Sequence, residues 1–142
     1  MVLFAKDVVE PVFLSLPRDI TALDAAKIMR EKNQGFIVVS AEGVPEGIVT
    51  EWDYISKVVS EGVDPAKVKL AQLMTAGLIT VQGSDGLDVV AKVMTEKGVR
   101  RVIVVQDGKV LGVITSRTIL ARLEDYVNAV SNTIARLQMP PF

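Results

Sequence analysis

The strongest constraint on the fold is an internal duplication, because the chain of 142 residues repeats itself at a fixed distance. A shift of 65 residues aligns the two halves without a gap from about Lys6 to Val58. Identical pairs occur along this whole span and include Ala26/Ala91, Lys27/Lys92, Met29/Met94, Glu31/Glu96, Lys32/Lys97, Val39/Val104, Gly43/Gly108, Gly47/Gly112 and Thr50/Thr115. Most other pairs keep apolar character. An ungapped match of this length predicts two tandem copies of one structural unit.

Each half predicts the same order of elements. A short extended piece leads into a helix in which apolar residues recur at helical spacing. A buried strand follows, at 36–39 or 101–105, and a glycine-containing turn returns the chain into a third strand. That strand runs straight into a helix, where Thr50 or Thr115 is placed to cap the first turn. Such a junction is a common location for a small anionic ligand, because backbone N–H groups remain unpaired there.

Composition excludes several classes of function. Hydrophobic residues make up 49% of the chain and charged residues 23%, which supports a packed core and gives no sign of disorder. The formal net charge of −1 argues against the broad basic surface that duplex nucleic acid needs. Because there is no cysteine and no histidine, thiol nucleophiles, disulfides, most zinc sites and the usual general base are absent. We therefore expect a protein that is not an enzyme and binds no metal.

The sequence also bears on location. No apolar run approaches the roughly 20 residues needed to span a bilayer. Residues 1–7 lack the basic-then-apolar order of a signal peptide. We therefore expect a cytoplasmic protein with no membrane partner.

The repeated motifs resemble the cystathionine-β-synthase (CBS) domain in its usual tandem arrangement. Segments 6–9 and 71–75 are similar to its short opening helix with the "VMT" ending, and a helix with a central alanine and a terminal methionine follows in each copy. Both copies then carry an acidic-Gly turn and a form of the signature G-[IV]-[VI]-T-x-x-D. The resemblance implies an α+β fold in which each repeat has a three-stranded mixed sheet with helices, and the pair is related by a pseudo-twofold axis. On this basis we expect repeats at 1–64 and 65–124 and a C-terminal helix extension and tail at 125–142.

The family resemblance further implies two clefts that take adenosine nucleotides. In the first cleft, Asp53 is the residue expected to hold the ribose, because a carboxylate can accept hydrogen bonds from two vicinal hydroxyls. An arginine at the start of the second repeat's strand is expected to bind phosphate, with one of Arg100 and Arg101 in contact and the other solvated. The full set expected at this cleft is Thr50, Trp52, Asp53, Thr80, Asp85, Val99, Arg100 and Arg101.

The second cleft departs from the family pattern, because Thr118 stands where the ribose-binding carboxylate is expected. Loss of the charge-assisted pair is expected to weaken binding about tenfold to a hundredfold or more. The cleft is then empty, weak or specific for a different ligand, and we expect it to be the poorer site. The residues expected to line it are Ser15, Ile20, Gln34, Gly35, Thr115, Arg117 and Thr118.

Three features keep two interpretations each. Asp53 also fits a first-turn acid that only complements the helix dipole. Trp52 fits a dimer surface as well as the border of a ligand. A long apolar stripe near the C-terminus packs either on its own core or on a partner subunit; it consists of Ile119, Leu120, Leu123, Val127, Val130, Ile134 and Leu137.

The resulting functional hypothesis is a regulatory module that binds AMP, ADP or ATP, with AMP favoured. It would sense the energy state of the cell and act on a separate, unknown effector protein through a homodimer. The first alternative is a constitutive dimerisation module with vestigial clefts. The second is a binder of S-adenosylmethionine or of nucleic acid, the latter recognisable by strong salt dependence. An enzyme is the weakest hypothesis, since no clustered acid–base pair is present.

Overall fold

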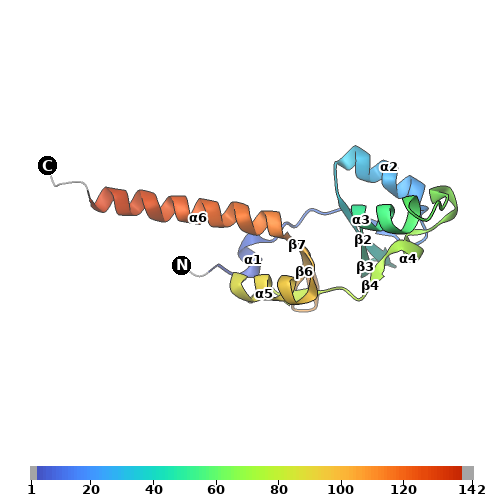
Figure 1. The fold of residues 1–142 in the computed structure, drawn as a ribbon. Coiled ribbons are helices and arrows are strands. Elements are labelled where there is room, and N and C mark those ends of the chain that lie inside the picture. The colour runs from blue at the N-terminus through green and yellow to red at the C-terminus, as the bar shows by residue number, and fades with distance from the viewer. Residues whose placement is uncertain (1–2, 139–142) are drawn as a thin grey trace. The chain divides into compact units, whose positions relative to one another are not determined.

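The computed structural model describes residues 3–138, which form an α+β protein with two compact units (Figure 1). The first-repeat unit comprises residues 12–79. The second-repeat unit comprises residues 80–138 together with residues 3–11 from the N-terminal end of the chain. Within residues 3–138, no helix is both long enough and apolar enough to cross a membrane.

The first-repeat unit is a mixed sheet covered by helices. Its strands are β1 (Ser15–Pro17), β2 (Phe36–Ala41), β3 (Val44–Thr50) and β4 (Thr75–Ala76). Its helices are α2 (Ala22–Lys32), α3 (Glu51–Tyr54), η1 (Ile55–Val59), η2 (Pro65–Lys67) and α4 (Leu70–Leu73). The strand order is β1-β2-β3-β4, with β1 parallel to β2 and the other pairs antiparallel. The core lies between the sheet and the helices and includes Ala25, Met29, Ile37, Val49, Leu70 and Leu73.

The second-repeat unit has the same topology. Its elements are α1 (Ala5–Val8), β5 (Thr80–Gln82), α5 (Leu87–Lys97), β6 (Arg101–Gln106), β7 (Lys109–Thr115) and α6 (Ser116–Leu137). Its sheet has the order β5-β6-β7, again with the first pair parallel and the second antiparallel. The register repeats as well, since Ser15 lies opposite Val38 in one sheet and Thr80 lies opposite Ile103 in the other. The predicted duplication and fold class are therefore confirmed.

The two sheets differ in one respect from the expected three strands. In the first-repeat unit, β4 adds a short fourth strand that pairs with β3 at Gly47 and Ile48. The corresponding position of the second-repeat unit holds a single bridge between Glu10 and Val113. The extra pairing arises because the segment that follows α4 runs beside β3 long enough to form a second bridge.

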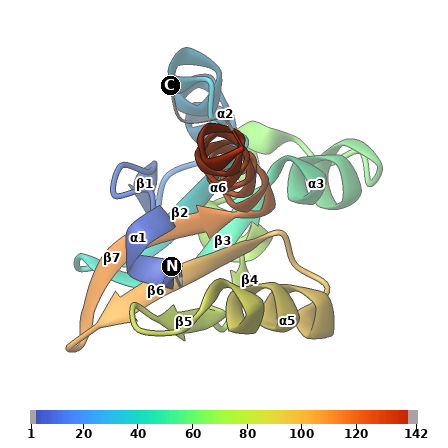
Figure 2. The same ribbon diagram turned by 90° about the vertical axis from the view of Figure 1, so that its left-hand side faces the viewer.

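The short opening helices are exchanged between the two sequence copies. In α1, the backbone N–H of Ala5 donates to the carbonyl of Asp85 at 2.8 Å, and α1 contacts β7 of its own unit, beside which it is seen in Figure 2. In α4, the N–H of Leu70 donates to the carbonyl of Ile20 at 3.0 Å. Each opening helix therefore packs on the sheet of the other copy. The expected repeat boundaries at residues 64 and 124 follow the sequence repeat and remain a prediction. The compact units are defined instead by which segments pack together.

The repeated glycine of the signature makes this exchange possible. A Cβ at Gly47 would lie 2.6 Å from the carbonyl oxygen of Thr75. A Cβ at Gly112 would collide with the carbonyl oxygen of Glu10 and lie 2.9 Å from a methyl group of Val9, and its φ of +154° is one that side chains rarely adopt. Both glycines are thus required because a backbone segment crosses the third strand at contact distance.

Replacement of this glycine tests the crossing. We expect Gly112→Ala to lower the free energy of unfolding by about 2 kcal/mol or more, because backbone atoms must move to admit the Cβ. The measurement is chemical denaturation followed by circular dichroism. Gly86→Ala is the control, since its Cβ would meet the carboxylate of Asp88, the far end of a flexible side chain. Equal losses in the two variants would contradict the close crossing.

Candidate ligand sites at the strand–helix junctions

The junction of the first-repeat unit is built around Asp53, a charged side chain that the fold buries with only 7% of its residue surface exposed. Thr50 ends β3 and is the N-cap of α3, as expected from the sequence. The backbone N–H and the hydroxyl of Thr50 both donate to Oδ2 of Asp53, at 2.8 and 3.3 Å. These bonds form the capping arrangement in which a third-position carboxylate turns back to the N-cap residue.

The other oxygen of Asp53 is engaged as well. Its Oδ1 lies 2.9 Å from Nζ of Lys57, one helical turn further along the chain. Nζ of Lys57 also donates to the carbonyl of Leu73 at the end of α4, at 2.7 Å. Asp53 therefore links the end of β3 to the first turn of α3 and, through Lys57, to the end of α4. Three of the roughly four acceptor positions of a carboxylate are used in this way, and a role with ribose remains a prediction.

The junction of the second-repeat unit also has a threonine cap at the start of a helix, but its carboxylate comes from another segment of the chain. Oγ1 of Thr115 accepts from the N–H of Thr118 at 3.1 Å, so this threonine caps α6 as predicted. The hydroxyl of Thr118 donates to Oε1 of Glu10 at 2.6 Å, and the hydroxyls of the two threonines are 2.8 Å apart. Glu10 is fixed in register with Val113, which exchanges two backbone hydrogen bonds with it.

A carboxylate nevertheless lies at this junction, although it does not come from position 118. Thr118 is neutral, but the N-terminal segment brings Glu10 to its hydroxyl. Sequence reasoning missed Glu10 because a 65-residue shift aligns it with Thr75, not with Asp53. The acid and the threonine are therefore swapped between two pairs of equivalent positions. Asp53 corresponds to Thr118, and Thr75 corresponds to Glu10. The repeated glycine, Gly47 and Gly112, is the sequence signal from which a crossing segment could have been predicted.

The other residues expected at the first cleft are divided between the units. Trp52 is 68% exposed on α3. In the second-repeat unit, Arg100 is exposed and Arg101, the first residue of β6, is half-buried, which agrees with the expected alternation. The remaining three are Thr80, exposed at the start of β5; Asp85, whose Oδ2 accepts from the N–H of Gln82 at 2.8 Å; and Val99, half-buried before β6.

The residues expected at the second cleft are divided in the same way. In the first-repeat unit, the hydroxyl of Ser15 is hydrogen-bonded to that of Ser40 at 2.9 Å, and Ile20 packs against the core. Gln34 and Gly35 lie in the short connection between α2 and β2. In the second-repeat unit, Thr115 and Thr118 have the contacts given above, and Arg117 is exposed in the first turn of α6. All these assignments stay predictions.

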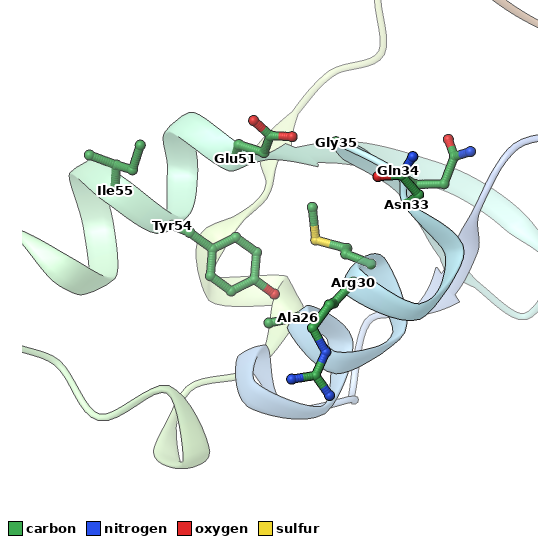
Figure 3. A pocket seen from close by; sticks show the side chains of 9 residues that line it. Ala26, Arg30, Asn33, Gln34, Gly35, Glu51, Tyr54 and Ile55 are labelled. Atoms are coloured by element: carbon green, nitrogen blue, oxygen red, sulfur yellow. The ribbon is translucent and has the colours of Figure 1, made fainter.

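Each unit also carries a surface hollow, and the two hollows lie at equivalent positions of the repeat. The first has a volume of about 370 Å³ and is shown in Figure 3; it is lined by Ala26, Met29, Arg30, Asn33, Gln34, Gly35, Glu51, Tyr54 and Ile55. The second has a volume of about 440 Å³ and is lined by Ala91, Met94, Thr95, Gly98, Val99, Ser116, Ile119 and Leu120. Both are mainly apolar, which suits the packing of a helix or a flat apolar group more than the binding of a phosphate.

Tyr54 closes one side of the first hollow, reaching from α3 toward α2 (Figure 3). Its hydroxyl donates to the carbonyl of Ala22 at 2.7 Å. Burial raises the pKa of Tyr54 from 10.0 to about 12, because desolvation disfavours the phenolate.

This shift predicts a loss of stability in alkali. Above pH 10 the tyrosine of the unfolded chain ionises while the folded one stays neutral, so the stability contributed by Tyr54 falls between pH 10 and about pH 12. We expect the free energy of unfolding of the wild type to decrease across this window relative to Tyr54→Phe, as measured by urea denaturation at stepped pH. Tyr126→Phe is the control for general alkaline effects. Parallel pH profiles for the wild type and Tyr54→Phe would contradict the shift.

Comparisons with known proteins identify the family of this chain. The model of the CBS domain family matches residues 5–60 and again 70–125. An uncharacterized protein of Methanopyrus kandleri is 39% identical over 111 residues, which cover 77% of this chain and 56% of that protein. The chain spans less than two thirds of the length of each of the first three curated relatives that it matches.

Two solved structures share the fold. The hexameric CBS-CP12 protein from bloom-forming cyanobacteria has a TM-score of 0.79 at 27% identity, with 96% of this chain and 83% of that chain covered. The CBS domain pair of protein MJ0100, in complex with 5'-methylthioadenosine and S-adenosyl-L-methionine, has a TM-score of 0.77 at 27% identity. That match covers 89% of this chain and 99% of the other. With both repeats matched by the family model and the whole fold shared, the chain belongs to the CBS domain family and contains a tandem pair of CBS domains.

Proposed function

We propose that this CBS pair is a regulatory module that binds an adenosine nucleotide, AMP above the others, and acts on a separate partner protein through a homodimer. The observation that carries the proposal is a carboxylate beside a threonine hydroxyl at both strand–helix junctions. Asp53 stands beside Thr50 in one unit, and Glu10 stands beside Thr118 in the other. A carboxylate with acceptor capacity left is the group that pairs with the vicinal hydroxyls of a ribose.

The two carboxylates differ in how much capacity they retain. Asp53 is buried and already accepts from two groups of Thr50 and from Lys57. Glu10 is exposed, and its Oε1 accepts from Thr118. The contacts therefore support a ligand at the second junction as well as at the first. The proposal assigns the ribose contact to Asp53 at one site and to Glu10 at the other.

Exposed arginines supply the phosphate contact in this proposal. Arg100 is exposed immediately before β6, and the bond that anchors it is made by its backbone carbonyl, which accepts from the N–H of Ser116 at 2.9 Å. Its guanidinium can therefore be removed with little effect on the fold. Arg117 is exposed on the first turn of α6 and is the arginine assigned to the second cleft. Because each of the two arginines is assigned to a different proposed site, substituting them one at a time tests the two sites separately.

Calorimetric titration with adenosine, AMP, ADP and ATP tests the proposal. We expect Arg100→Ala to weaken AMP binding about tenfold to a hundredfold at the first site, the loss of one charge-assisted phosphate contact. Binding of adenosine, which has no phosphate, stays the same. Arg117→Ala is the matched control, and we expect it to change only the second site. If the folded wild type binds none of the four ligands, the sensor hypothesis fails and a constitutive assembly module is favoured.

A second candidate ligand is S-adenosylmethionine, which is a sulfonium nucleoside, or a thioether nucleoside such as 5'-methylthioadenosine. It is supported by the structure of the MJ0100 CBS pair, which was solved with 5'-methylthioadenosine and S-adenosyl-L-methionine. These ligands carry the same ribose and adenine but no phosphate. In the titration 5'-methylthioadenosine, which has no anionic group, would bind the wild type and Arg100→Ala with equal affinity, and this distinguishes it from AMP.

A further inference from the structure

The last helix, α6, carries an apolar surface that the rest of its unit does not cover. Its first two turns are anchored, because Ile119 is buried and Nη2 of Arg122 donates to the carbonyl of Asp7 at 3.4 Å. Beyond this point every described residue of α6 is exposed except Tyr126, which is half-buried. Figure 1 shows α6 extending past α1 and the sheet of its own unit. The helix therefore leaves the body of the unit with its side chains in solvent.

The exposed apolar residues of α6 follow a coiled-coil pattern. Six aliphatic side chains, each 40% or more exposed, are separated by alternating steps of three and four residues: Leu120, Leu123, Val127, Val130, Ile134 and Leu137. This is the a and d spacing of the heptad repeat, which produces a narrow apolar seam. A helix that covers the core of its own domain carries a broader stripe that includes a third position of each heptad.

The residue types favour two parallel strands. With Leu120 at the first a position, Val127 and Ile134 are β-branched residues at a, and Leu123 and Leu137 are leucines at d. β-Branched residues at a with leucine at d favour a parallel dimer. Leu120 and Val130 depart from this preference, but both are apolar and keep the seam continuous.

The flanking positions permit pairing between identical helices. The e and g positions beside the seam hold Glu124, Tyr126, Ser131, Thr133 and Gln138. Glu124 is the one charged residue among these five, so two copies bring no like-charged e and g residues together across the seam. The part of α6 that follows Arg122, residues 123–137, is about 22 Å long, close to the length below which an isolated helix is marginal in water. A second copy supplies a complementary seam along its whole length.

We infer that α6 pairs with α6 of a second copy of this chain in a parallel, in-register, two-stranded coiled coil. The inference deepens the homodimer of the proposed function by assigning its contact surface and orientation. It implies that Leu123 meets Leu123 and Ile134 meets Ile134 across the twofold axis. In an antiparallel pair of the same seam, residue 123 would instead meet residue 134.

Single cysteines distinguish these arrangements, because the chain contains no cysteine of its own. Leu123→Cys and Ile134→Cys are equilibrated separately in a glutathione redox buffer. We expect each variant to form a disulfide between the introduced cysteines of two copies, since the same position of two parallel helices comes within bonding reach. Asp125→Cys, on the opposite face of the helix, is the control and should stay monomeric on a non-reducing gel.

The mixed sample completes this test. An antiparallel pair would separate identical cysteines by about 16 Å along the helix. It would then give only the disulfide between residues 123 and 134 when the two variants are mixed. That result, or cross-linking no stronger than in Asp125→Cys, would overturn the inference.

Charge in the seam provides an independent test by sedimentation at a series of protein concentrations. We expect Val127→Lys combined with Ile134→Lys to raise the dimer dissociation constant at least about a hundredfold. Asn128→Lys with Asn132→Lys adds the same charge away from the seam and should leave the constant unchanged. Far-ultraviolet circular dichroism checks that each variant is folded. We expect unchanged spectra of the folded units, because the four substituted side chains are exposed and contribute nothing to the core.

The outcomes are separate from those of the ligand titration. A wild type that stays monomeric at all concentrations overturns the inference. A monomer is the result expected if another part of the same chain covers the seam. A dimer that survives both lysine substitutions also overturns it and assigns dimerisation to another surface. Absence of nucleotide binding in a dimeric wild type would refute the proposed function and leave the coiled coil intact.

Discussion

The structure depends on a close crossing of two backbone segments at the third strand of each sheet. In β3 and β7 the crossed position is a glycine, Gly47 or Gly112, because the carbonyl of the crossing segment occupies the space of a side chain. The segment that crosses β7 comes from the N-terminal end of the chain, and the one that crosses β3 comes from between the copies. Each crossing carries an opening helix onto the sheet of the other sequence copy, so the glycines determine how the chain divides into compact units.

The same crossing determines the chemistry of the junctions. In the second-repeat unit it positions Glu10, whose backbone is held by Val113 and whose carboxylate reaches Thr118. In the first-repeat unit the carboxylate belongs to the helix itself, and Lys57 ties it to α4, the helix that precedes the crossing segment. Two copies of one sequence pattern therefore place a carboxylate beside a threonine by different routes. The burial of Asp53 and the exposure of Glu10 are consequences of those routes.

The helices that follow the junctions diverge for a related reason. After α3 the chain widens into a π-helical turn and buries Val58 in the core of the first-repeat unit. After the corresponding point in α6, the equivalent apolar residue is Leu123, and it is 41% exposed. The first copy thus uses its last helix to close its own core. The second copy extends the helix and presents the aliphatic residues to solvent, which makes it the part of the chain suited to a partner.

The sequence alone determined the duplication, from the 65-residue spacing between the copies, and the main elements and the threonine caps, from local periodicity within each copy. The repeated motifs added the resemblance to the CBS family. The sequence also identified Asp53 as a first-turn acid and the C-terminal stripe as an apolar surface. Only the tertiary structure decided that the opening helices are exchanged, that Glu10 reaches Thr118, and that the stripe beyond Ile119 lies uncovered by its own unit. The physical reason is distance along the chain: Glu10 and Thr118 are 108 residues apart, and a contact of that kind depends on how packed units bring segments together, which no local pattern encodes.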